Sequence, residues 1–438
     1  MTKTGQATYL ELSAYEHFFL NEEHPEYPIC PILYLCFQQA LDPKRLRGAV
    51  RKAQARHPLL RALINGSGSQ PRKSLRWVIP SQSPEPWLHV AKDGEGEAYP
   101  ADARQIDLRH EAGLRLFLKS PNELLLQFHH AATDGIGMLQ FVRDLFFAYH
   151  EQDHILGPAN LAKLNEGRLF NRVLPGGWGL LQDLRQILGL IRFKPEGIEG
   201  RRRPGSSMMP QSQSGLYDCF CVSQLPEADF VPIRAFCKKH QLTLNDLLLY
   251  SLEQTVRHWN QKPLQRVRIS MPMNLRGPAD YDSPACNMTG LYFYERGEQI
   301  EPRLAALGEV HREMMKVKTG GLVSAFNRLS LLMGRFRYGL RWMVGEFDPK
   351  RCQTSTCLSN LGRIDQFLPR EIFAKNQLEI VGGCAPIRPG TTATFCVASY
   401  HGQMSISTLC DPLFFDAQTA NELLHLFIAQ IRDIVREV

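Results

Sequence analysis

The sequence predicts an α/β protein made of two lobes. Both halves of the chain mix strand-like runs with long amphipathic helices, a pattern typical of helices packed on sheets. The 438 residues exceed what a single hydrophobic core usually holds. Residues 196–215 are rich in Gly, Pro, Ser and Gln and lack apolar periodicity, which favours an exposed linker. We therefore expect an N-terminal lobe over residues 1–195 and a C-terminal lobe over residues 216–438.

The first half begins with a predicted helix over residues 42–55, which Pro58 ends, and a strand-like run follows at 60–64. Two apolar runs, 114–118 and 124–128, flank a Pro-Asn turn and predict a β-hairpin. A helix follows from Ile136, with its apolar residues on one face. The second strand of the hairpin therefore leads directly into a helix.

The second half repeats this alternation. Thr243 or Asn245 can cap a helix over 247–259, and 267–273 has the pattern of a strand. The region after Glu301 is helical. Further strand-like runs and a last helix complete the half, at 354–358, 392–400, 404–409 and from about Asp416. Each half therefore carries the elements of an α/β lobe.

Composition excludes several classes of protein. The net charge of +7, from 51 basic and 44 acidic residues, suits an anionic partner, but no DNA- or RNA-binding signature is present. Eleven cysteines lie scattered without a CxxC pair, as in a cytoplasmic protein with reduced thiols. Cys219 and Cys221 have the spacing of one strand face rather than of a metal site. No signal peptide and no membrane-spanning stretch is evident, so we expect a cytoplasmic protein without a nucleic-acid partner.

Two stretches, 178–193 and 326–344, are amphipathic and basic. The favoured interpretation is a pair of core-packed helices with a solvated basic side. The alternative is peripheral contact with a membrane surface through residues 326–344.

One cluster of residues carries chemistry. His129 and His130 end the strand at 124–128, and Asp134 and Gly135 open the helix that follows. Strand alternation sends the two imidazoles to opposite faces, so only one projects into a shared cleft, and together they form a poor metal chelate. A neutral imidazole at this place is suited to remove a proton from an alcohol, amine or thiol. Gly135 is expected to adopt a backbone conformation that a side chain would exclude. A buried histidine pair beside a helix-capping aspartate is the plain structural interpretation, and the combined spacing favours catalysis over it.

The segment His129-His130-Ala131-Ala132-Thr133-Asp134-Gly135 resembles the HHxxxDG signature of the condensation-domain/chloramphenicol-acetyltransferase superfamily. Other segments resemble further motifs of these proteins and follow in the same order. They are Leu-Ser-Ala-Tyr-Glu at 12–16, Arg-His-Pro-Leu-Leu-Arg at 56–61, Thr-Leu-Asn-Asp at 243–246, Pro-Met-Asn-Leu-Arg at 272–276, Asn287, and Ser-Asn-Leu-Gly at 359–362. The resemblance therefore extends over the whole chain.

The resemblance implies two chloramphenicol-acetyltransferase-like lobes that form a V with a tunnel between them. His130 would be the general base that deprotonates an alcohol or amine acceptor as it attacks a thioester. The donor would be an acyl-CoA or an acyl group on a phosphopantetheine carrier protein, with no bound cofactor, no metal and no acyl-enzyme on a cysteine. Asp134 would pair with Arg276 in a structural role. The residues expected to support the active site are His129, Asp134, Gly135, Arg276 and Asn287.

Some features depart from the pattern. Cys286 stands before Asn287 where glycine is usual, and the DFGWG motif of plant BAHD enzymes and the PLW motif of wax ester synthases are missing. Adenylation and carrier-serine motifs are also missing, which indicates a stand-alone acyltransferase. One alternative is a stand-alone nonribosomal-peptide-type condensation enzyme that forms an amide from carrier-bound substrates. Another is a non-catalytic relative that binds a lipid or a partner protein.

Overall fold

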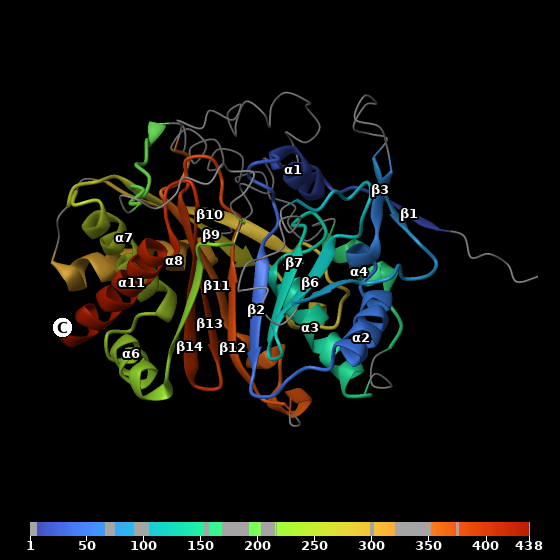
Figure 1. The fold of residues 1–438 in the computed structure, drawn as a ribbon. Coiled ribbons are helices and arrows are strands. Elements are labelled where there is room, and N and C mark those ends of the chain that lie inside the picture. The colour runs from blue at the N-terminus through green and yellow to red at the C-terminus, as the bar shows by residue number, and fades with distance from the viewer. Residues whose placement is uncertain are drawn as a thin grey trace, which may run out of the picture. The chain divides into compact units, whose positions relative to one another are not determined.

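Figure 1 shows the computed structural model, which describes residues 7–65, 75–91, 105–152, 157–168, 192–202, 215, 217–297, 302–319, 352–373 and 376–437. The chain divides into two compact units. The first comprises Met1–Arg172, Asn274–Thr289 and Ile364–Val381, and the second comprises Val173–Met273, Gly290–Arg363 and Gly382–Val438. Each unit combines β-sheet with helices, which confirms the predicted α/β class with two sheet-based lobes. The V and the tunnel stay predictions.

The compact units differ from the predicted lobes because two late segments belong to the first unit. Hydrogen bonds explain this assignment. The backbone N–H of Gln38 donates to the carbonyl of Gln377 at 2.8 Å, and Arg276 pairs with Asp134 at 2.8 Å. Two segments from the second half of the chain therefore belong to the compact unit formed by the first half.

Of the described residues in the predicted linker at 196–215, Glu196, Glu199, Gly200 and Arg201 are exposed, but Ile198 is not. Ile198 is buried, with 2% of its surface exposed. The indole N–H of Trp259 donates to the carbonyl of Glu199 at 2.8 Å, and the backbone N–H of Glu199 donates to Asn260 Oδ1 at 2.9 Å. These residues pack within the second unit, and residues 203–214 lie outside the described part of the chain.

The first unit is built around a mixed five-stranded sheet in the order β12-β2-β7-β6-β5. The strands are β2 (Ile32–Phe37), β5 (Trp87–Val90), β6 (Leu114–Ser120), β7 (Glu123–Phe128) and β12 (Leu378–Cys384). β6 and β7 form the predicted hairpin, with Leu114 opposite Phe128. β7 lies between β2 and β6, and its Leu124–Leu126 are fully buried. The sheet and the core therefore fix the position of the carboxyl end of β7.

A second, three-stranded sheet has the order β1-β4-β3. It consists of β1 (Thr8–Glu11), β3 (Leu63–Asn65) and β4 (Arg76–Ile79). The strand predicted from residue 60 begins only at Leu63. Pro58–Arg61 form a 3₁₀ helix, η1, since proline fixes the backbone near helical values.

The described α-helices of the first unit are α1 (Ala14–Glu22), α2 (Pro43–Arg56), α3 (Gly135–Tyr149) and α4 (Leu161–Arg168). Ser13 and Glu16 form a reciprocal capping box at the start of α1. The carboxylate of Glu16 is fully buried, and it accepts hydrogen bonds from Trp77 Nε1 and Arg168 Nε, both at 2.9 Å. The Leu-Ser-Ala-Tyr-Glu segment thus anchors α1 to β4 and α4. α2 packs against α3 (Figure 1).

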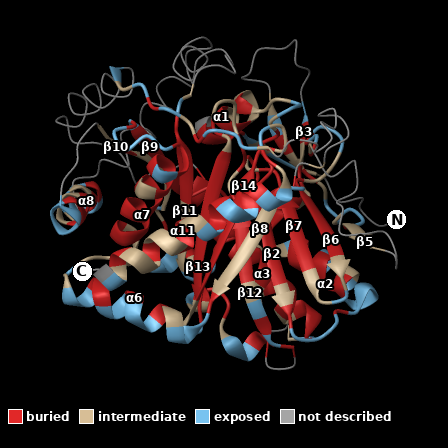
Figure 2. Ribbon diagram, turned by 60° about the vertical axis from the view of Figure 1, so that its left-hand side comes forward, coloured by how far each residue is buried: buried red, intermediate tan, exposed pale blue. Residues whose placement is uncertain are grey.

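The second unit contains a six-stranded sheet in the order β10-β9-β11-β13-β14-β8. Its strands are β8 (Phe220–Leu225), β9 (Val267–Asn274), β10 (Thr289–Arg296), β11 (Thr356–Arg363), β13 (Ala393–Tyr400) and β14 (Gln403–Cys410). All residues of β13 are buried, as Figure 2 shows. Its helices include α6 (Glu227–Lys239), α7 (Leu244–Trp259), α8 (Arg303–Thr319) and α11 (Ala417–Glu437), of which α11 packs on β14 and β8. Thr243, rather than Asn245, caps α7, so this helix begins three residues before the predicted start.

The two basic stretches fall almost entirely outside the described residues, which include only 192 and 193 of 178–193 and none of 326–344. Membrane contact through 326–344 therefore stays a prediction. Within the described ranges, no helix combines the length and the apolar character needed to cross a lipid bilayer.

Removing the buried Glu16 carboxylate is expected to destabilise the first unit strongly. Glu16→Ala leaves Arg168 buried without its anion, and breaking a buried pair typically costs about 3–5 kcal/mol. Glu85→Ala is the matched control, because Glu85 and its partner Arg51 are exposed and such pairs contribute little. Urea denaturation measures both, and equal unfolding midpoints for the two variants would contradict this prediction.

Candidate active site

The two histidines follow β7 at its carboxyl end. The backbone N–H of His129 donates to Gly113 O at 3.0 Å, and that of His130 donates to Ile29 O at 2.9 Å. Successive residues thus continue the strand pattern, bonding alternately toward β6 and β2. His129 is fully buried, whereas His130 is partly exposed. The two side chains therefore occupy different environments.

Each ring nitrogen of His129 faces a polar group, and one of them makes a hydrogen bond. The backbone N–H of Ala131 donates to His129 Nδ1 at 3.0 Å. On the other side, Nε2 lies 3.2 Å from Oε1 of Glu23, at ion-pair distance but outside hydrogen-bond geometry. His129 thereby braces the tight turn that carries the chain from β7 toward α3.

His130 is oriented by a ring and by an amide. Its imidazole stacks on Phe19 of α1, with ring centroids 4.0 Å apart and planes 13° from parallel. Its Nδ1 lies 3.2 Å from Oδ1 of Asn287. The amide N–H₂ of Asn287 donates to the carbonyls of His130 and Ala131 at 2.7 and 3.1 Å. Asn287 therefore contacts both the ring of His130 and the backbone that carries it.

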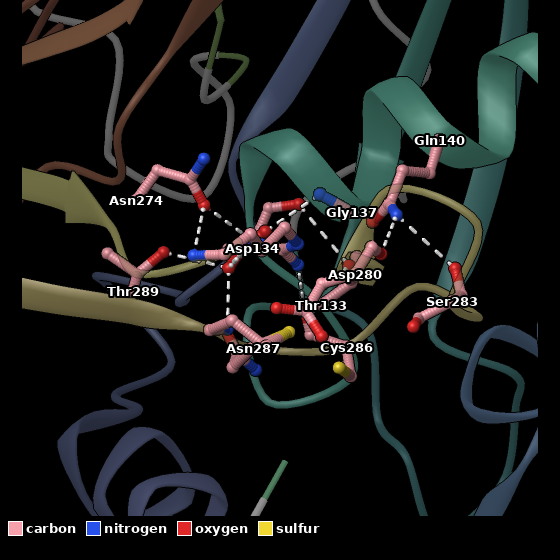
Figure 3. A network of polar contacts seen from close by, with 12 residues as sticks. Thr133, Asp134, Gly137, Gln140, Asn274, Asp280, Ser283, Cys286, Asn287 and Thr289 are labelled. Atoms are coloured by element: carbon pink, nitrogen blue, oxygen red, sulfur yellow. Dashed lines mark hydrogen bonds and ion pairs between the residues drawn. The ribbon is translucent and has the colours of Figure 1, made fainter. Parts of the chain in front are cut away.

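Asp134 caps α3 and gathers four donors on its carboxylate (Figure 3). Oδ1 accepts from the backbone N–H of Gly137 at 2.7 Å. Oδ2 accepts from Arg276 Nη1 at 2.8 Å, Met288 N at 2.7 Å and Thr289 Oγ1 at 2.8 Å. Burial raises the pKa of Asp134, but the charge of Arg276 and these hydrogen bonds outweigh it and lower the pKa below its usual value. Asp134 is thus an ionised structural group.

Arg276 links Asp134 to the loop before Asn287. Its Nη2 donates to the carbonyl of Cys286 at 2.7 Å, and Nη1 also reaches Asn274 Oδ1 at 3.3 Å. Burial lowers the pKa of Arg276, but the Asp134 carboxylate more than reverses this effect, so the guanidinium stays charged. The Asp134–Arg276 pair therefore fixes the backbone on both sides of Asn287.

The glycine that this site requires is Gly137 rather than Gly135. Gly135 is the first residue of α3 and does not have a positive φ, so the expectation of an unusual backbone there is wrong. A Cβ on Gly137 would overlap the Thr133 hydroxyl and lie 3.0 Å from the carbonyl of Cys286. The close approach of α3 to this loop explains the need for glycine, and the sequence alone does not reveal it.

A second network holds the other end of the same loop. Gln140 Nε2 donates to the carbonyls of Asp280 and Tyr281, both at 2.8 Å. His57 Nδ1 accepts from the backbone N–H of Ala285 at 2.8 Å, while its Nε2 lies 3.0 Å from Asp144 Oδ2. The resemblance included His57 only as part of a motif, and the structure gives it a definite contact.

In the first unit the structure thus brings together His129, His130, Asp134, Arg276 and Asn287 from the predicted set. Sequence reasoning missed Phe19, Glu23, Gly137 and Thr289, which contact members of this set. Within the described ranges, no group of three or more His, Cys, Asp or Glu side chains is arranged to hold a metal ion.

We compared the chain with known families, sequences and solved structures. No family model matches the chain. The uncharacterized proteins MT2362 and Rv2305 of Mycobacterium tuberculosis are each 25% identical over 371 residues, covering 81% of this chain and 83% of theirs. Among solved structures, the TRI3 trichothecene 15-O-acetyltransferase from Fusarium sporotrichioides superimposes with a TM-score of 0.68 at 13% identity, covering 99% of this chain and 96% of that one. The starter condensation domain of rhizomide synthetase RzmA, solved in complex with C8-CoA and Leu-SNAC, gives a TM-score of 0.63 at 13% identity over 98% and 95%.

The chain has the condensation-domain fold. The likeness extends over essentially the whole chain and includes both an acetyltransferase and a condensation domain. At such low identity it concerns the fold, and it agrees with the superfamily to which the sequence motifs point. Within this condensation-domain fold, His130 and its surroundings stand at the junction of β7 and α3.

A methyl group at position 137 is expected to be far more damaging than one at 135. Gly137→Ala overpacks the contact with Cys286, and such changes cost about 1–3 kcal/mol. Gly135→Ala, at an ordinary helical backbone, is expected to be neutral or slightly stabilising. Urea denaturation of both variants tests this, and a greater loss for Gly135→Ala would contradict the assignment.

We expect acid to lower the stability of the fold by protonating His57, whose Nδ1 accepts a hydrogen bond from the Ala285 N–H. Burial lowers the pKa of His57 despite the neighbouring Asp144, whose own pKa is depressed to about 2 because His57 and two arginines offset its burial. Below about pH 6.5 the unfolded chain therefore binds more protons than the folded one, and the free energy of unfolding falls as pH falls. Denaturation between about pH 8 and pH 5 should give a steeper fall for wild type than for His57→Gln. Equal slopes would contradict the prediction.

Proposed function

We propose that this chain is an acyltransferase that moves an acyl group from a phosphopantetheine thioester to an alcohol or amine. His130 is the general base. The observation that carries the proposal is the contact of His130 Nδ1 with Asn287 Oδ1. An amide oxygen can only accept, so Nδ1 holds the proton and Nε2 holds the lone pair. The ring is partly exposed, which suits proton transfer to and from a substrate.

The reaction then proceeds in one covalent exchange. His130 Nε2 takes the proton from the acceptor O–H or N–H as that atom bonds to the thioester carbonyl carbon. The tetrahedral intermediate collapses and its C–S bond breaks. The imidazolium returns the proton to the departing thiolate, which regenerates the neutral base. General-base assistance of this kind contributes about 10²–10⁴-fold to the rate.

The remaining residues support this step without taking part in it. Asp134 has its donors in place and stays paired with Arg276, so it orders the loop rather than transferring protons. Cys286 lies beside the same pair, and burial raises the pKa of its thiol to about 12. A thiol that stays protonated is a poor nucleophile, which favours direct transfer over an acyl-enzyme.

The donor is an acyl-CoA or an acyl carrier protein. Both are anionic, and the chain's net charge of +7 suits either. The acceptor is a small alcohol or amine. Amide formation between carrier-bound substrates remains the alternative within the same fold, and a strict requirement for carrier-bound donors would identify it.

Replacement of His130 is expected to abolish acceptor-dependent thiol release. Wild type and His130→Ala are compared on acyl-CoAs of graded chain length with pooled alcohols and amines. The variant should be slower by about 10²–10⁴-fold, the contribution of a general base. His110→Ala is the matched control, because His110 is an exposed histidine of the same unit that bonds only Asp107 in the described structure.

Equal release by wild type and His130→Ala would overturn the role of His130. Release by neither protein would exclude acyl-CoA, and the same assay with carrier-bound thioesters would follow. Failure there too would favour the non-catalytic interpretation, in which the chain binds a lipid or partner protein.

A further inference from the structure

We infer that Asn287 and Glu23 hold the adjacent histidines in opposite tautomers, His130 with its proton on Nδ1 and His129 with its proton on Nε2. Asn287 and Glu23 are thus positioning residues, and they act through the imidazoles. The consequence for rate rests on the proposed function, whereas the tautomers themselves can be measured without any substrate.

The amide of Asn287 has only one acceptable orientation. Its N–H₂ group lies 2.7 and 3.1 Å from the carbonyl oxygens of His130 and Ala131. A flipped amide would place Oδ1 against two other oxygens, which repel it. Oδ1 therefore faces His130 Nδ1 at 3.2 Å, and two lone pairs facing each other would also repel. This contact is favourable only when Nδ1 carries the proton.

The partners of His129 impose the reverse arrangement. The backbone N–H of Ala131 points at Nδ1 from 3.0 Å, so Nδ1 must be the acceptor. Nε2 faces a carboxylate oxygen of Glu23 at 3.2 Å, and the Glu23 side chain is only 14% exposed. A lone pair there would be repelled by the anion, whereas an N–H is attracted to it at any angle that brings the proton near. His129 therefore carries its proton on Nε2.

Helix α1 and the residue that follows it support both rings. Phe19 of α1 stacks on His130, and Glu23, which comes directly after the helix, faces His129. The start of the same helix is anchored through Glu16, which pairs with Arg168. Because stacking holds the plane of the His130 ring, its Nδ1 stays in line with the Asn287 amide. The anchored helix thus fixes what each imidazole contacts.

The tautomer of His130 decides which side of its ring is basic. Nδ1 is the ring nitrogen nearer the backbone, and in His130 it is occupied by Asn287. The lone pair therefore lies on Nε2, the nitrogen farthest from the chain. In the other tautomer the lone pair would face Asn287, where no acceptor substrate can bind.

Nitrogen NMR of protein labelled with ¹⁵N in its histidine rings tests the assignment, since protonated and unprotonated ring nitrogens have well-separated chemical shifts. His130→Ala and His129→Gln assign the signals. At neutral pH, wild type should have Nδ1 protonated in His130 and Nε2 protonated in His129. Asn287→Leu should mix the tautomers of His130, and Glu23→Leu should mix those of His129. Glu23→Gln should restore His129, because its amide oxygen can still accept from Nε2.

Asn376→Leu is the matched control for the asparagine. Asn376 is also buried in the first unit, and its amide also bonds backbone atoms on both sides, those of Gln39. This control should leave both histidine tautomers unchanged. In the thiol-release assay, Asn287→Leu should lower kcat by between about ten- and a thousand-fold with little change in KM, as expected when a base is left in the wrong tautomer.

Asn287→Asp gives a second readout, because the leucine variant also loses two backbone hydrogen bonds. A carboxylate facing Nδ1 stabilises the imidazolium, so the acid limb of the pH–rate profile and the NMR titration of His130 should move to higher pH. A purely structural role would leave that midpoint in place. Protonated Nε2 on His130 in wild type, or an unshifted titration in Asn287→Asp, would overturn the inference. Correct tautomers in a protein that transfers no acyl group would instead refute only the proposed function.

Discussion

The candidate site depends on the ion pair and hydrogen bonds of the buried Asp134 carboxylate. A buried anion is costly to desolvate, and it persists only where charge and hydrogen bonds compensate for the lost water. Asp134 meets this requirement with the guanidinium of Arg276, two backbone N–H groups and a hydroxyl. One N–H belongs to the first turn of α3, and the other donors come from residues 276–289. The compensation therefore joins two parts of the chain that are far apart in sequence.

The position of Asn287 follows from that junction. Met288 bonds Asp134 through its N–H, and the Cys286 carbonyl bonds Arg276, so the residue between them has little freedom. Its amide then contacts the ring and the carbonyl of His130. If Asn287 sets the tautomer of His130 as we infer, the Asp134–Arg276 pair, which transfers no proton, determines which nitrogen of His130 is basic. This dependence runs through the backbone, and within one short segment it links the structural Asp134 to His130, the proposed base.

The sequence predicts well what is decided locally. The β6–β7 hairpin depends on residues within a few positions of each other, so turn chemistry identifies it. Capping chemistry narrows the cap of α7 to Thr243 or Asn245, and the structure selects Thr243. The pairing of Asp134 with Arg276 spans 142 positions and was expected only because the motifs resemble known ones. Nothing local to Gly137 indicates that Cys286 will lie against it.

The same limit applies to the helix and the linker. Nothing in the sequence around Phe19 and Glu23 indicates a role at the site, and only folding places them against the two histidines. The composition of residues 196–201 is typical of a linker, yet Ile198 is buried and Trp259 bonds the backbone there. Composition reports what a segment prefers in isolation. A few specific hydrogen bonds to a neighbouring helix are sufficient to override that preference.

A neutral partner for His130 is consistent with the chemistry proposed. In a Ser-His-Asp triad a carboxylate orients the imidazole and also stabilises the imidazolium, which serves substrates whose leaving groups need a strong proton donor. Asn287 orients the ring in the same way but adds no charge. A thiolate departs readily, because ordinary thiols have a pKa of about 8.5, and so it needs less help from a proton. An amide partner orients the base without adding charge beside it. The proton that the base takes from the acceptor is the one that the thiolate receives, and a thioester needs no stronger assistance than this.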